Sequence, residues 1–124
     1  RALPALSQAQ EVIERVGRVD FDLLLAQGSL ENLREKLAVL EKTERGDQNI
    51  AFGEVLLSAA ALAYRHGVDA ESALRERLMK VRSRFAWMEA KATASGNDLV
   101  DLSEEEKNHL WDEAREALNG EEGA

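Results

Sequence analysis

The chain has 124 residues, enough for one domain with its own core, although at this size a partner subunit adds stability. Its formal charge of −8 excludes nucleic acid and anionic membranes as partners, because both need a clustered basic surface. No apolar run reaches the roughly 20 residues of a membrane helix. The absence of cysteine excludes disulfides and thiolate metal sites and fits a cytoplasmic protein. Since the first residue is Arg1 and not methionine, we expect a domain of a longer protein.

The N-terminal third of the chain predicts two helices. Apolar residues at steps of three and four predict a first helix from Leu3 to about Val16, which Gly17 ends. Residues 20–28 predict a loop, whose consecutive leucines we expect to pack against the rest of the protein. Ser29 predicts the N-cap of a second helix, because its hydroxyl accepts a hydrogen bond from the free backbone N–H groups of a first turn.

The middle of the chain predicts a helix that is covered on most sides. From about Ile50 to Arg65 the sequence is apolar nearly all round, and such a helix belongs at the centre of a bundle or at a subunit interface. The preceding residues 43–49 are rich in turn-forming side chains and predict a connection. Gly67 suits the position after the helix, where the backbone must be left-handed.

The C-terminal third predicts two more helices. Asp69 predicts the cap of a long helix that runs to about Ser95. Ser103, followed by Glu106 three residues later, is typical of a capping box at the start of a last helix.

These elements together predict an all-α protein, because nothing in the sequence alternates with the period of a strand. We expect one antiparallel bundle of about five helices over residues 1–119, completed by dimerisation, and a frayed tail at residues 120–124.

Short motifs follow one another in a distinctive order along most of the chain. They are Leu3-Pro4-Ala5-Leu6, Arg18-Val19-Asp20-Phe21-Asp22, Leu33 to Leu40, Ala51 to Glu54, Arg65-His66-Gly67-Val68-Asp69, Lys80 with Arg84-Phe85 and Trp87, and Leu110-Trp111. In this order and at these spacings, they resemble the MazG family of all-α nucleoside triphosphate pyrophosphohydrolases, in particular its C-terminal domain. The resemblance implies a homodimer in which a metal-activated water cleaves a nucleoside triphosphate between its α- and β-phosphates.

The metal-binding positions of that family are altered here. The resemblance implies a Glu-x-x-Glu on one helix and a Glu-x-x-Asp on the next, which map to Lys36, Val39, Ala51 and Glu54. Mg²⁺ takes hard oxygen ligands in near-octahedral geometry, and of these four side chains Glu54 alone supplies one. We therefore expect a MazG-like domain with no cofactor and a degenerate site, which serves a structural, oligomerising or regulatory role in a larger protein.

Lys80 and Arg84 stay as possible phosphate ligands. They lie in a basic segment of the long predicted helix, and the resemblance implies a nucleotide contact for Lys80. The alternative is that the cations of this segment pair with glutamates at helical spacing. Trp87 and Trp111 either stack on a nucleobase or pack in the core or at an interface, and packing is the commoner role.

Two other functions are open at this point. An atypical Mg²⁺ site built from Glu54, Asp47 and Glu35 would make the chain an active pyrophosphohydrolase, although helix geometry points Glu35 away from the face that Lys36 and Val39 share. A helical interaction module unrelated to nucleotides would respond to neither metal nor nucleotide.

The altered positions also predict contacts between helices. Lys36 lies one turn from Val39, and Glu54 lies one turn from Ala51. If the two helices pack as in the family, Lys36 forms a direct ion pair with Glu54 where the metal ion would lie, and Val39 packs on Ala51.

Overall fold

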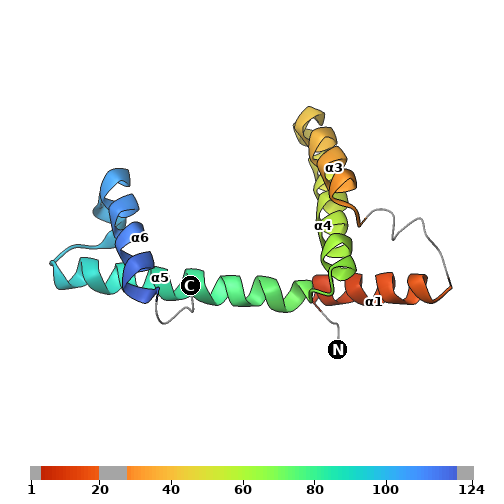
Figure 1. Ribbon diagram of the computed structural model, residues 1–124. Coiled ribbons are helices and arrows are strands. Elements are labelled where there is room, and N and C mark those ends of the chain that lie inside the picture. Colours follow the sequence, from red (N-terminus) through yellow and green to blue (C-terminus); the bar gives the residue numbers. More distant parts are fainter. Residues whose placement is uncertain (1–3, 20–27, 120–124) are drawn as a thin grey trace. The chain divides into compact units, whose positions relative to one another are not determined.

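The computed structural model describes residues 4–19 and 28–119. Its helices, in chain order, are α1 (Ala5–Arg18), α3 (Leu30–Lys42), the 3₁₀ helix η1 (Arg45–Asp47), α4 (Gln48–Arg65), α5 (Ala70–Ala94), the 3₁₀ helix η2 (Leu99–Asp101) and α6 (Glu104–Leu118) (Figure 1). The described part of the chain contains no strand, so the prediction of an all-α protein is confirmed. A helix able to span a membrane is absent from these same ranges. The predicted tail and all but the last residue of the predicted 20–28 loop lie outside the described residues.

Contacts along the chain divide it into two compact units, Arg1–Leu74 and Arg75–Ala124. The division falls inside α5, so the first turn of this helix belongs to the first unit and the rest to the second. That residues 1–119 form one helical bundle stays a prediction.

Most helix ends follow the local sequence, but the prediction that Gly17 ends the first helix is wrong, because Gly17 lies inside α1, which continues to Arg18. The Ser29 hydroxyl accepts the backbone N–H of Asn32 at 3.0 Å, as predicted for an N-cap. The capping box is also confirmed: the Ser103 hydroxyl accepts the Glu106 N–H at 3.1 Å, and the Glu106 carboxylate accepts the Ser103 N–H at 2.9 Å. The hydrogen bond that the carboxylate accepts from the Ser103 backbone, and after it the interaction with the Ser103 side chain, lower the pKa of Glu106 below its ordinary value of 4.5. Gly67 has the predicted left-handed backbone, with φ of 71°.

The first turn of α5 is capped from two directions. The Asp69 carboxylate accepts the backbone N–H of Glu71 at 3.1 Å, which confirms the predicted cap. The Gln10 side chain of α1 accepts the N–H of Ala70 at 2.6 Å, a contact that local sequence signals do not predict. Through Gln10, the start of α5 is tied to α1 within the first unit.

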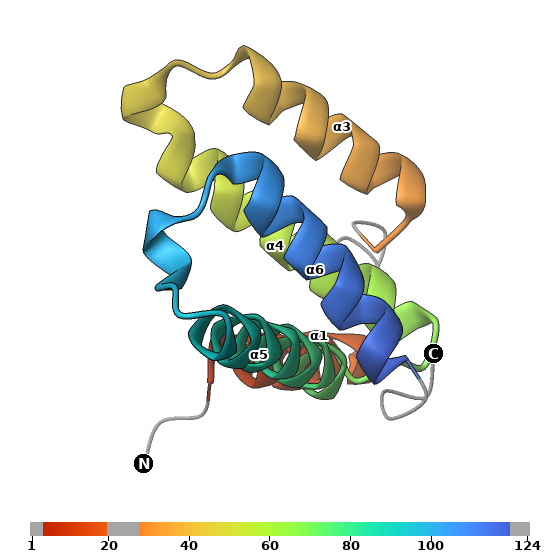
Figure 2. The same ribbon diagram turned by 90° about the vertical axis from the view of Figure 1, so that its left-hand side faces the viewer.

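In the first unit α4 packs against both α1 and α3. Figures 1 and 2 show α3 and α4 side by side and antiparallel, joined through η1. The small core lies where α1 meets α4 and consists of Ile13, Ala60 and Ala61 with Leu6, Ala9, Leu57 and Tyr64 against them. At the start of α3, Gly28 is buried, and a Cβ there would lie 2.8 Å from the Ala61 carbonyl oxygen of α4. Close approach to α4 therefore requires glycine at this position.

The central place of α4 in its unit agrees with its apolar composition, but part of its surface is uncovered. Ile50, Phe52 and Leu56 are exposed to 73 %, 50 % and 59 %. Two packing helices do not cover a helix that is apolar on nearly every side.

In the second unit α5 presents one buried stripe of Arg84, Met88 and Ala92, at four-residue steps. Ala114 is the fully buried residue of α6. The guanidinium of Arg84 lies over the Trp111 ring of α6, with 5.3 Å from Cζ to the ring centroid. Trp111 is partly buried and packs within this unit, whereas its role in a core or an interface stays a prediction.

Candidate functional site at the α3–α4 seam

Two polar contacts fix the register between α3 and α4. The Ser58 hydroxyl donates to the Asn32 side-chain oxygen at 2.9 Å, and Lys36 Nζ lies 3.5 Å from Glu54 Oε1. Four residues forward along α3 thus correspond to four residues back along α4, as expected for antiparallel helices. Three residues further along α3, the same register pairs Val39 with Ala51.

The register brings together the four positions that the resemblance maps to metal ligands. They are Lys36 and Val39 on α3 and Ala51 and Glu54 on α4, and together they form the α3–α4 seam. The predicted ion pair between Lys36 and Glu54 is confirmed. The side chains of Lys36 and Glu54 are 26 % and 48 % exposed, so water screens the pair and it contributes about 0.2–1 kcal/mol. Ala51 is buried and Val39 is half exposed, and direct packing between these two side chains stays a prediction.

The donor chemistry of this seam does not fit Mg²⁺. An ammonium, an isopropyl group and a methyl group offer no oxygen ligand, and the remaining carboxylate, on Glu54, is paired with Lys36. Over residues 4–19 and 28–119, no three or more His, Cys, Asp or Glu side chains gather in a way that could hold a metal ion. The alternative set of Glu35, Asp47 and Glu54 is therefore not assembled in this structure.

The two basic candidates on α5 differ in their surroundings. Arg84 is 7 % exposed, and its guanidinium lies over the Trp111 ring. Lys80 is partly buried, on the same helix. Nearby, Lys91 Nζ lies 5.7 Å from the centroid of the Trp87 ring. Phosphate binding by Lys80 or Arg84 stays a prediction.

Sequence reasoning missed the Asn32–Ser58 hydrogen bond. Ser58 is 1 % exposed and is the polar residue inside the otherwise apolar stretch of α4 from Val55 to Ala63. A buried hydroxyl needs a hydrogen-bond partner, so a single serine in an apolar stretch indicates a polar contact with a neighbouring helix. Its partner could be found only once the register between α3 and α4 was known.

No family profile matches the sequence, and no solved structure matches it. The chain is 35 % identical over 65 residues to the uncharacterized protein YabN of Bacillus subtilis (strain 168). The matched segment is 52 % of this chain and 13 % of YabN, so the chain corresponds to a small part of that relative.

Proposed function

We propose that this chain is a MazG-like domain in which an internal salt bridge has replaced the metal-dependent hydrolase site. Its role is then structural, oligomerising or regulatory within a larger protein. The observation that carries the proposal is the Lys36–Glu54 ion pair at 3.5 Å, together with the register that sets Val39 opposite Ala51. The short match to the much longer YabN supports a role as part of a larger protein.

The electrostatics of the seam explain how such a site keeps its fold without a metal ion. In the active relatives that the sequence resembles, four carboxylates crowd together and repel one another unless a cation lies among them. Here the Lys36 ammonium provides the positive charge from within the chain. Because this cation is covalently attached and already paired, it cannot coordinate a substrate phosphate and an attacking water in the way that a metal ion does.

The same proposal includes a homodimer. The uncovered α4 residues Phe52 and Leu56, four residues apart on one face of the helix, form an apolar surface of the kind that marks partner sites. We expect a dimer by light scattering at micromolar concentration, and a shift toward monomer when Phe52→Glu is introduced. Glu31→Lys, at an exposed position on α3, is the control for a charge change outside this surface. A wild-type monomer would count against the assembly.

The rival function is an active pyrophosphohydrolase with Mg²⁺ on Glu54, Asp47 and Glu35. Release of pyrophosphate from a panel of nucleoside triphosphates, with Mg²⁺ or Mn²⁺, separates the two proposals. We expect no metal-dependent release. Turnover that needs the metal and disappears in Glu54→Ala would establish the rival.

A variant designed to bind metal tests whether Lys36, Val39, Ala51 and Glu54 occupy the positions of the family's metal ligands. The triple variant Lys36→Glu, Val39→Glu, Ala51→Glu places four carboxylates on the seam, and we expect Mn²⁺ to raise its melting temperature while leaving the wild type unchanged. The single variant Lys36→Glu is the matched control, because it has two carboxylates and no complete ligand set. If Mn²⁺ stabilises the triple variant no more than this control, the four positions do not form the family's metal site.

A further inference from the structure

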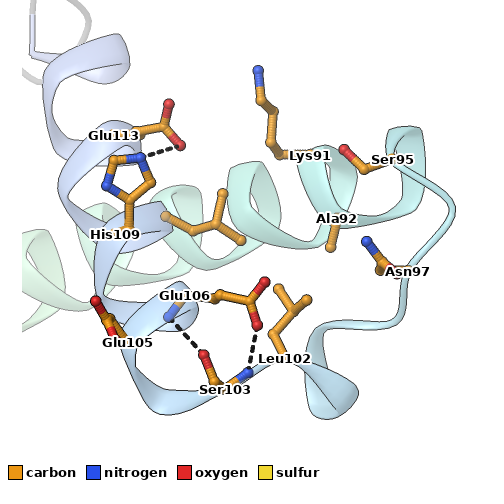
Figure 3. Close-up of a pocket in the computed structure, with 11 residues that line it drawn as sticks. Lys91, Ala92, Ser95, Asn97, Leu102, Ser103, Glu105, Glu106, His109 and Glu113 are labelled. Atoms are coloured by element: carbon orange, nitrogen blue, oxygen red, sulfur yellow. Dashed lines mark hydrogen bonds and ion pairs between the residues drawn. The ribbon is translucent and has the colours of Figure 1, made fainter.

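A groove in the second unit lies outside the α3–α4 seam and has no role in the function proposed above. It is bounded by the C-terminal part of α5, the connection through η2 and one face of α6 (Figure 3). Its volume is about 530 Å³, and its apolar lining comes from Ala92, Leu102 and Leu110. This volume is large enough for a bulky aliphatic side chain and the backbone on either side of it.

The rim of the groove is acidic. Glu105, Glu106 and Glu113 supply three carboxylates, and Lys91 supplies the one ammonium group. The Glu106 carboxylate accepts the Ser103 N–H, and Glu113 Oε1 lies 3.7 Å from the His109 ring nitrogen, whereas Glu105 lies at an exposed position. The Lys91 ammonium lies over the Trp87 ring, and Figure 3 shows the Lys91 side chain pointing away from Leu102. An occupant with positive charge beside an apolar group would therefore complement this groove, whereas a phosphate-bearing ligand would be repelled.

The groove is open along one side, which argues against a small molecule. The Lys91, Ser95 and Glu105 positions are exposed, and the His109 side chain at the rim is 75 % exposed. Small-molecule sites enclose most of the ligand surface, and this groove does not. A polypeptide needs only to insert one side chain while its backbone and neighbouring residues stay at the surface.

We propose that this groove binds a short segment of a partner polypeptide that carries one leucine-like side chain flanked by lysine or arginine. The apolar side chain contacts Ala92, Leu102 and Leu110, and the flanking cations contact Glu105 and Glu113. This surface would give the domain a means of attachment to a basic segment of another protein, independently of any nucleotide.

The test uses the ¹⁵N-labelled 124-residue chain and three blocked pentapeptides, Lys-Arg-Leu-Arg-Lys, Lys-Arg-Ser-Arg-Lys and Glu-Asp-Leu-Asp-Glu. We expect Lys-Arg-Leu-Arg-Lys to shift the amide resonances of Ala92 and Leu102 at millimolar concentration. The serine and acidic peptides should bind about tenfold more weakly, since each lacks one of the two complementary features.

Charge variants on α6 supply the matched comparison. Glu105→Lys at the rim should weaken the basic peptide about fivefold, whereas Glu116→Lys, an exposed position on the same helix outside the groove, should leave its affinity unchanged. Glu106 is left intact because it belongs to the capping box. Equal loss in both variants would reduce the binding to general charge attraction and overturn the proposal. Absence of shifts at Ala92 and Leu102 in the wild type would overturn it too.

Discussion

Both units place a cation where helices meet, and the two cations differ in how far they are buried. In the first unit the Lys36 ammonium meets the Glu54 carboxylate, and both side chains stay partly in water. In the second unit the Arg84 guanidinium is nearly buried over the Trp111 ring. The guanidinium is more weakly hydrated than an ammonium and stacks on aromatic faces, so it tolerates burial better. Water reaches the Lys36–Glu54 pair and is largely kept from Arg84, so loss of the contact should cost more stability in the second unit than in the first.

The largest effect is expected where the cation is buried. Trp111→Ala removes a large side chain and uncovers Arg84, so the free energy of unfolding should fall by about 3 kcal/mol in a denaturant titration. Trp87→Ala is the control, because its partner Lys91 is exposed, and its loss should be clearly smaller. If both substitutions lower the free energy of unfolding equally, the contact with the buried Arg84 adds nothing to stability.

A smaller effect is expected at the polar contact that sets the register of the first unit. Ser58→Ala leaves the Asn32 oxygen without its donor, and this should cost about 1–2 kcal/mol of unfolding free energy. Ser83→Ala, at an exposed position of α5, should cost far less. Because both single changes remove the same hydrogen bond, the double variant with Asn32→Ala should lose less than the sum of the two single losses.

Removal of the partly exposed ion pair should have a still smaller effect. Lys36→Met should lower the unfolding free energy by about 0.2–1 kcal/mol, and the difference from wild type should shrink in concentrated NaCl. Lys42→Met on the same helix is the matched control for loss of a lysine. A loss above about 3 kcal/mol would instead indicate a buried, unscreened pair.

The smallest effect on stability is expected from the charge of Glu106, at the exposed start of α6. The pKa of Glu106 is lowered in the folded protein, so its contribution to stability is present above 4.5 and is lost as the pH falls through the lowered folded value. The melting temperature of wild type should therefore exceed that of Glu106→Gln at neutral pH, and the gap should close in acid. A gap that does not depend on pH would show that the charge of Glu106 is irrelevant.

The sequence predicted features that depend on neighbouring residues. The caps at Ser29, Asp69 and Ser103 follow from hydrogen bonds within one turn, so they could be assigned before any tertiary contact was known. The Lys36–Glu54 pair could be predicted because the family resemblance indicated which faces of the two helices meet. Hydrophobic periodicity alone does not give this information.

Contacts between distant segments could not be predicted in the same way. The Gln10 cap of Ala70 joins residues 60 apart, and no local pattern in either segment specifies the other. The division of the chain was also not predictable, because it falls inside α5, where no glycine or proline interrupts the helix. Tertiary contacts, not local signals, separate the two units.

The Lys36–Glu54 pair has a further consequence for how this sequence can evolve. A single change of Lys36 to glutamate would set two carboxylates together with no cation between them, and a glutamate at Ala51 would enter a position that is 6 % exposed. Two of the three changes that would complete four carboxylates at these positions are therefore unfavourable on their own, whereas a glutamate at the half-exposed Val39 is not.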